Sequence, residues 1–139
     1  MFALTQGLRR AAQTKPDGIS AHFSGRRRTW EQTVDRVSRV AGALFALGVR
    51  PGDRVAILAL NGDRYFELMY AIPWIGAALV PINTRLAAPE IEYILSDSGA
   101  VALFIDTAMS HHLTPLEHRM PSVREVIWLD DIASPDGML

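Results

Sequence analysis

Residues 76–95 read GAALVPINTRLAAPEIEYIL, and this stretch indicates how the chain is built. The apolar run 77–82 is typical of a strand that is buried on both faces. Pro89 suits the first turn of a helix, where its missing N–H has no partner to lose, and Glu90 is favoured there by the helix dipole. A buried strand followed closely by a helix is the repeating unit of a parallel α/β fold.

The same alternation continues on both sides of this stretch. Thr29-Trp30-Glu31-Gln32 matches a capping box, and a helical apolar spacing follows it as far as Gly48. The expected helices are 4–14, 30–47, 63–75, 89–98 and 108–118, and Asn61 or Asp63 is the expected cap of the third. The expected strands are 19–23, 27–29, 55–60, 77–82, 101–105 and 126–129.

This order of elements predicts an α/β fold with a mostly parallel sheet flanked by helices and a short N-terminal hairpin. The hairpin would join 19–23 to 27–29 through Ser24-Gly25. Its basic run, Arg26 to Arg28, is interpreted as a solvated arm and not as a phosphate track. A length of 139 residues fits one unit spanning 1–139.

Composition excludes several classes of protein. The chain is 49% hydrophobic with a formal net charge of −1, so it can bury a core and lacks the basic excess of a nucleic-acid binder. It has no cysteine, which rules out disulfides and thiolate catalysis. No run reaches the roughly 18 apolar residues of a transmembrane segment. We therefore expect a cytoplasmic protein that binds no nucleic acid and does not cross a membrane.

Motifs for catalysis are missing from the sequence. It contains neither of the glycine-rich loops that hold nucleotide phosphates, and its one lysine, Lys15, lies in an apparent loop beside a proline. His111, His112 and His118 lack a carboxylate at ligand spacing, so we expect no metal site there. From the motifs alone the chain is a binding or scaffold module, and Arg85 is its best-placed polar residue, although no catalytic residue is assigned.

Taken together, the segments resemble the N-terminal portion of the adenylate-forming acyl-CoA synthetases. The matching pieces include LFALGVRPGDRVAIL, LNGDRYFELMYA, GAALVPINTRL, PEIEYILSDSGA and VALFID, in order from about Leu4 to Asp131. The resemblance implies an ATP-dependent ligase that converts a carboxylic acid, fatty or aryl, to an acyl-adenylate and transfers the acyl group to coenzyme A. It also implies ATP, Mg²⁺ and coenzyme A as cofactors of the whole enzyme.

The family places its phosphate loop, its adenine contacts and its catalytic lysine beyond the matched region. We therefore expect a partial N-terminal subdomain of a larger enzyme, which is inactive alone, binds no cofactor alone and has the remainder of the synthetase as partner. A homodimer is possible, and the resemblance does not decide whether the protein forms one. The resemblance further implies that Arg85, in Asn83-Thr84-Arg85-Leu86, contacts a phosphate of coenzyme A; a structural ion pair with Glu90 is the alternative.

Two other functions stay open at this point. The chain could be a non-catalytic α/β interaction module that kept the fold and lost the chemistry. It could also belong to an adenylation domain that loads a carrier protein instead of coenzyme A. The sequence specifies neither the acyl chain length nor the oligomeric state.

Overall fold

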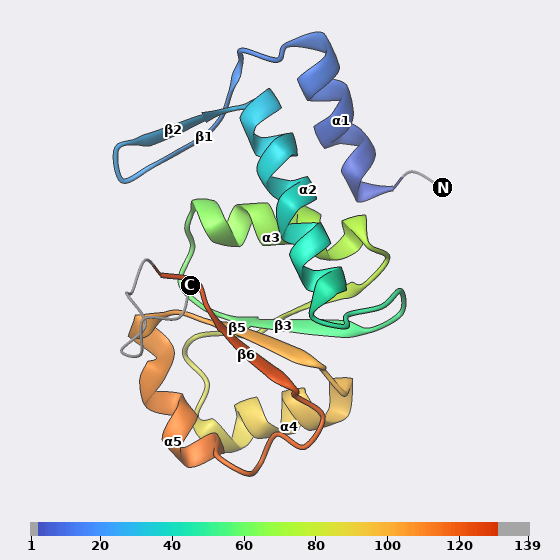
Figure 1. Cartoon of the computed structure of the whole chain (residues 1–139). Coiled ribbons are helices and arrows are strands. Elements are labelled where there is room, and N and C mark those ends of the chain that lie inside the picture. The colour runs from blue at the N-terminus through green and yellow to red at the C-terminus, as the bar shows by residue number, and fades with distance from the viewer. Residues whose placement is uncertain (1–2, 131–139) are drawn as a thin grey trace.

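A four-stranded parallel sheet forms the centre of the molecule. The computed structural model describes residues 3–130. The strands are β3 (Arg54–Leu58), β4 (Ala78–Pro81), β5 (Ala102–Ile105) and β6 (Glu125–Trp128), and their order in the sheet is β4-β3-β5-β6 (Figure 1). The predicted α/β fold with a parallel sheet is confirmed.

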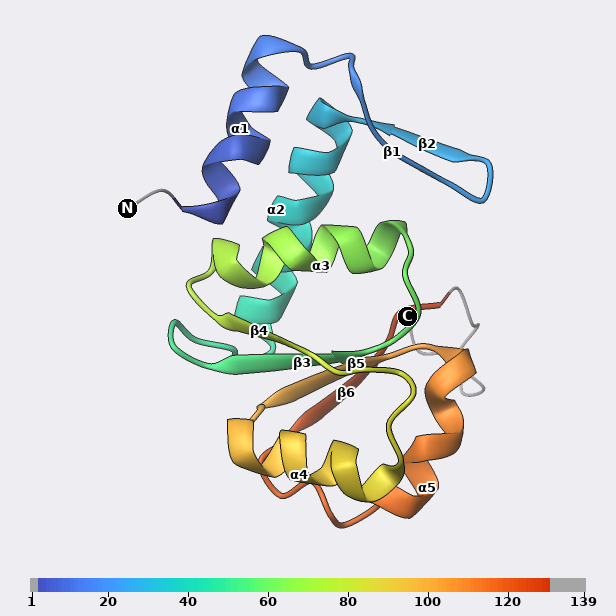
Figure 2. The same cartoon turned by 180° about the vertical axis from the view of Figure 1, so that it is seen from behind.

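Helices cover both faces of this sheet. α1 (Leu4–Thr14), α2 (Trp30–Ala46) and α3 (Asp63–Trp74) lie on one side. α4 (Ala88–Ser98), the 3₁₀ helix η1 (Thr107–His112) and the short α5 (Leu113–Leu116) lie on the other, as Figures 1 and 2 show from opposite directions. Within the described residues no helix is both long enough and apolar enough to pass through a bilayer.

The apolar sequence of the central strands follows from this covering. Successive strand side chains point to opposite faces, so Val55 and Ile57 belong to the core under α2 and α3, whereas Ala56 and Leu58 belong to the core above α4. All four are buried. Because helices cover both faces of the strand, its successive side chains are apolar, without the alternation of apolar and polar residues that a half-exposed strand shows.

An antiparallel hairpin stands beside these layers. It consists of β1 (Ile19–Phe23) and β2 (Arg26–Thr29), and it projects past α2 in Figure 1. An isolated two-stranded hairpin is only marginally stable, so contacts with the body must hold it. One such contact joins the Ser20 and Thr33 hydroxyls at 2.5 Å.

The capping box that opens α2 is confirmed. The Gln32 backbone N–H donates to Thr29 Oγ1 at 3.2 Å, and the Thr29 N–H donates to Gln32 Oε1 at 3.0 Å. Gly48, just beyond the helix, has φ of 90°, a conformation that side chains strongly disfavour.

Two local predictions were wrong. The N-cap of α3 is Gly62, and neither Asn61 nor Asp63 caps the helix with its side chain, because Asp63 is instead paired with Arg26. The single helix expected over 108–118 is divided into η1 and α5, which suits a stretch that contains Pro115.

Candidate functional site

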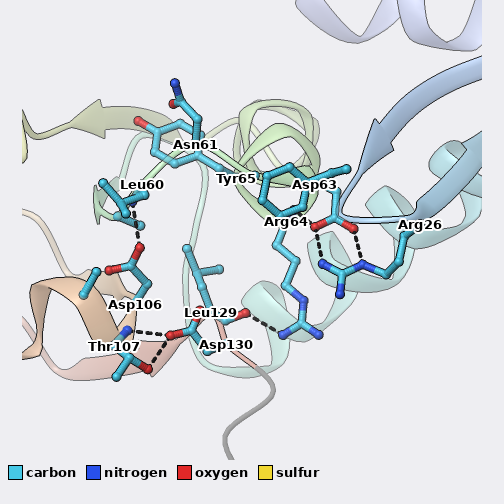
Figure 3. Close-up of a pocket in the computed structure, with 14 residues that line it drawn as sticks. Arg26, Leu60, Asn61, Asp63, Arg64, Tyr65, Asp106, Thr107, Leu129 and Asp130 are labelled. Carbon is cyan, nitrogen blue, oxygen red and sulfur yellow. Dashed lines mark hydrogen bonds and ion pairs between the residues drawn. The ribbon is translucent and has the colours of Figure 1, made fainter.

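An open crevice lies at the carboxyl ends of the central strands. The chain leaves β3 towards β4 by way of α3, on one face, and leaves β5 towards β6 by way of η1 and α5, on the other. In parallel α/β sheets, ligands bind where neighbouring strands diverge in this way. The crevice has a volume of about 470 Å³ and is lined by Phe23, Arg26, Ala59–Tyr65, Asp106–Ala108, Leu129 and Asp130 (Figure 3).

Asp106 fixes the loops on both sides of the crevice. It follows β5 directly and is 8% exposed. Its Oδ2 accepts the Leu60 N–H at 2.7 Å, and its Oδ1 accepts the Met109 N–H at 3.0 Å. One carboxylate therefore ties the loop after β3 to the start of η1.

A second pair of contacts fastens the end of β6. Asp130 Oδ2 accepts hydrogen bonds from both the backbone N–H and the hydroxyl of Thr107. The Arg64 guanidinium, from the first turn of α3, donates to the Leu129 carbonyl (Figure 3). The loops after β3, β5 and β6 are thus linked to one another by side chains, and the crevice is defined before any ligand binds.

The hairpin closes one side of the crevice through an ion pair. Arg26 Nε and Nη2 donate to the two oxygens of Asp63 at 2.9 and 2.8 Å. The Asp63 side chain is 4% exposed. The Arg26 hydrogen bond holds the pKa of Asp63 below its usual value, although burial acts in the opposite direction. The expectation that the basic run is a solvated arm is therefore wrong for Arg26.

This ion pair gives a prediction for stability against pH. Because the folded state lowers the pKa of Asp63, its contribution is fully present above the ordinary value of 3.8 and is lost as the pH falls through the lower folded value. Asp63→Asn should reduce the free energy of unfolding at pH 7, and its curve should converge with that of the wild type in acid.

Urea titrations from pH 7 downwards measure this convergence. The exposed Asp17→Asn serves as control and should run parallel to the wild type. A difference between Asp63→Asn and the wild type that stays constant across the pH range would contradict the assigned role of the pair.

A smaller hollow adjoins the crevice. It measures about 220 Å³ and lies between the loops that follow β3 and β4. Asn61 and Tyr65 line both spaces, and burial raises the pKa of the Tyr65 hydroxyl. The smaller hollow reaches Asn83 and Thr84, so the two spaces form a path along the sheet edge towards the segment that contains Arg85.

Arg85 lies at this edge, in the turn after β4. The residue is exposed, and its backbone N–H donates to Asn83 Oδ1 at 2.9 Å. Glu90 accepts the Ala87 N–H at 2.8 Å, and within residues 3–130 it makes no ion pair with Arg85. The Arg85 guanidinium is therefore available to a ligand at the rim.

The titratable side chains near the crevice are few. No group of three or more histidine, aspartate or glutamate side chains in residues 3–130 could hold a metal ion. His112 is buried, which lowers its pKa, whereas His118 is exposed. The charges that line the crevice are mixed: the carboxylates of Asp106 and Asp130 lie there together with the guanidinium groups of Arg26 and Arg64.

Sequence reasoning did not single out the residues that shape the crevice. Asp106 follows an apolar strand directly, a position that places a side chain at the carboxyl edge of a parallel sheet, so its location was a usable signal. Asp130 directly follows the last expected strand, 126–129, and carried the same signal; its neighbour Asp131 lies outside the described residues. Arg64 carried no signal, because its partner is a backbone carbonyl 65 residues away.

Comparison with known proteins gives consistent results. The sequence model of one family, described as "AMP-binding enzyme", matches residues 8–138. A fatty acid–[acyl-carrier-protein] ligase, ScoC, from Streptomyces coeruleorubidus is 39% identical over 111 residues, covering 80% of this chain and 21% of that protein. A feruloyl-CoA synthase from an Amycolatopsis species is 43% identical over 94 residues, covering 68% of this chain and 19% of that protein.

Solved structures share the fold. The N-terminal domain of FACL13 from Mycobacterium tuberculosis superimposes with a TM-score of 0.88 at 34% identity, covering 96% of this chain and 35% of that one. The chain spans about a fifth of the length of the curated relatives named above.

Proposed function

Because the chain belongs to the AMP-binding enzyme family, we propose that residues 1–139 act as the N-terminal subdomain of an ATP-dependent acid–thiol ligase. The relatives are ligases of fatty or aromatic acids, which supports a carboxylic acid of one of these classes as substrate. In this proposal the remainder of a synthetase is the partner, and it supplies the residues that bind ATP and Mg²⁺. The cytoplasm is the proposed location.

The observation that carries the proposal is the crevice at the diverging strands. Its loops are fixed by Asp106 and Asp130, and it opens along the sheet edge towards Arg85. The sequence around it carries neither of the glycine-rich loops that hold nucleotide phosphates. We infer that this part of the chain forms one wall of a channel for the acyl group and the thiol, and that the triphosphate lies elsewhere.

A chimeric ligase tests the proposal. Residues 1–139 would replace the matching part of the Amycolatopsis feruloyl-CoA synthase, and the product would be assayed with a panel of fatty and aryl acids for AMP and thioester formation. We expect activity with at least one acid. A folded chimera that is inactive with every acid would favour the alternative of a non-catalytic interaction module.

A second candidate function differs only in the thiol that accepts the acyl group. The similarity to ScoC, over 80% of this chain, favours a carrier protein as acceptor to the same degree that the feruloyl-CoA synthase favours coenzyme A. Offering the chimera equal concentrations of coenzyme A and of a phosphopantetheinylated carrier protein separates the two. We expect coenzyme A to be preferred, because in this proposal the exposed Arg85 contacts a nucleotide phosphate, which the carrier protein lacks.

Arg85→Ala in the chimera should raise KM for coenzyme A about ten- to a hundredfold. A guanidinium that donates to a phosphate contributes roughly 1.5–3 kcal/mol, and the arginine fork is suited to that group. Acyl-adenylate formation, trapped with hydroxylamine, should not change, since no coenzyme A takes part in that step.

Two variants make this prediction specific. Arg85→Lys keeps the charge and should lose less affinity than alanine. Arg10→Ala, on the exposed side of α1, removes an arginine far from the sheet edge and should leave KM unchanged. An equal loss of adenylate formation and of transfer in Arg85→Ala would contradict a role in binding coenzyme A.

A further inference from the structure

A buried carboxylate on α3 lies outside the crevice and has not yet been given a role. Glu67 is 3% exposed, and it lies one helical turn after Asp63 on the same face of α3. Its two oxygens accept hydrogen bonds from Nε and Nη2 of Arg36, in the second turn of α2. α3 therefore presents two buried carboxylates in a row, and an arginine binds each of them in a bidentate manner.

The two arginines belong to one continuous segment of the chain. Arg26 is in β2, which runs directly into α2, and α2 crosses α3 in Figures 1 and 2. The hydrogen bond between the Ser20 and Thr33 hydroxyls attaches β1 to the same helix. The hairpin and α2 are thus joined to each other, and together they contact α3 at two successive turns.

The Arg36–Glu67 pair is ionised in the folded chain. The hydrogen bond from Glu67 raises the pKa of the Arg36 guanidinium above its usual value, although burial acts in the opposite direction. A buried ion pair of this kind adds little stability compared with apolar residues of similar size, because both charges lose their hydration. A bidentate arginine–carboxylate pair does, however, require one relative orientation of its two groups.

We propose that Arg36 and Glu67 are positioning residues for the ligase reaction, because they fix the rotation of α3 and thereby the place of residues 62–65 at the crevice. The proposal rests on the function inferred above for the crevice. Neither residue lines the crevice, so both act through the helix. A displacement of about 1 Å caused by a remote substitution can slow a reaction about a hundredfold, so a shift of the first turn of α3 is enough to affect catalysis.

Replacing the pair by apolar residues, in the chimera with the feruloyl-CoA synthase, separates positioning from stability. Arg36→Met combined with Glu67→Leu should leave the chimera folded, since such replacements of a buried ion pair are often neutral or stabilising. KM for the carboxylic acid and for coenzyme A should rise about tenfold, whereas KM for ATP should not change, because other residues bind ATP in the proposed function. A purely structural role would lower kcat through loss of folded protein and would leave every KM at its original value.

Two further variants make the test specific. Arg36→Lys keeps the charge but loses the bidentate geometry, so it should raise the same two KM values by a smaller factor. Asp35→Leu combined with Arg39→Met is the matched control, because it removes an exposed ion pair of 3.0 Å from the same helix. The control should leave all three KM values unchanged.

The outcomes distinguish this inference from the function on which it rests. An active chimera whose KM values are unchanged by both Arg36→Lys and the apolar replacement would overturn the inference and leave the proposed function intact. A control pair that raises KM as much as the buried pair would also overturn it. If the apolar replacement does not fold, Arg36→Lys decides alone. A folded chimera that is inactive before any of these substitutions would overturn the proposed function and this inference with it.

Discussion

Asp106→Ala should destabilise the folded chain by about 2–3 kcal/mol. The substitution removes two hydrogen bonds to a carboxylate and leaves the N–H groups of Leu60 and Met109 without that partner. The loop after β3 would lose its link to η1, and the crevice would lose its fixed shape. Chemical denaturation gives the free energy, and hydrogen exchange at Leu60 and Met109 shows whether the effect is local.

Two comparisons separate this role from a general effect of removing a charge. Asp106→Asn keeps one acceptor oxygen and should retain part of the stability. Asp17→Ala removes an exposed carboxylate and should change the free energy of unfolding by less than about 0.5 kcal/mol. Equal, small effects of Asp106→Ala and Asp17→Ala would show that Asp106 does not hold the loops.

Leu103→Ala should have the largest effect of any single change considered, about 2–5 kcal/mol. Leu103 is completely buried in β5, one of the two central strands of the sheet, among the side chains that pack between the sheet and α4. A domain of this kind has a total stability of only about 5–15 kcal/mol. Thermal unfolding should therefore begin close to physiological temperature in the variant.

An exposed leucine provides the control for this prediction. Leu4 begins α1 and is 59% exposed, so Leu4→Ala removes the same atoms without leaving a cavity. Its unfolding midpoint should stay close to that of the wild type. Similar midpoints for Leu4→Ala and Leu103→Ala would mean that the core above α4 is not close-packed.

Local signals in the sequence predicted the elements well. The capping box at Thr29 and the glycine at 48 act within a few residues of themselves, so their patterns determine where α2 begins and ends. The apolar runs of β3 and β5 identify covered strands, because a strand buried on both faces tolerates no polar side chain.

Contacts between distant residues were the part that could not be predicted. Alternating strands and helices do not state which strands are neighbours, and the order β4-β3-β5-β6 depends on packing across the whole sheet. Asp63 was expected to cap α3 because capping is the local use of an aspartate. Its actual partner, Arg26, comes from the hairpin 37 residues earlier and reaches it only in the folded chain.

In the candidate site, too, residues identified by local sequence were predicted, and residues with distant partners were not. The position of Arg85 at the sheet edge followed from its place after an apolar run, whereas the role of Asp106 depends on an N–H 46 residues away. The crevice is formed by loops from three strands and by the hairpin, and it exists only once all of them are assembled.

The central proposal is that this chain provides one wall of a ligase whose nucleotide chemistry is carried out by other residues. The exchange of labelled pyrophosphate into ATP, in the presence of a carboxylic acid, measures that chemistry directly. The account predicts no exchange by residues 1–139 alone and restored exchange by the chimera with the feruloyl-CoA synthase. Exchange by the 139-residue chain alone, at a rate comparable with that of its full-length relatives, would contradict it.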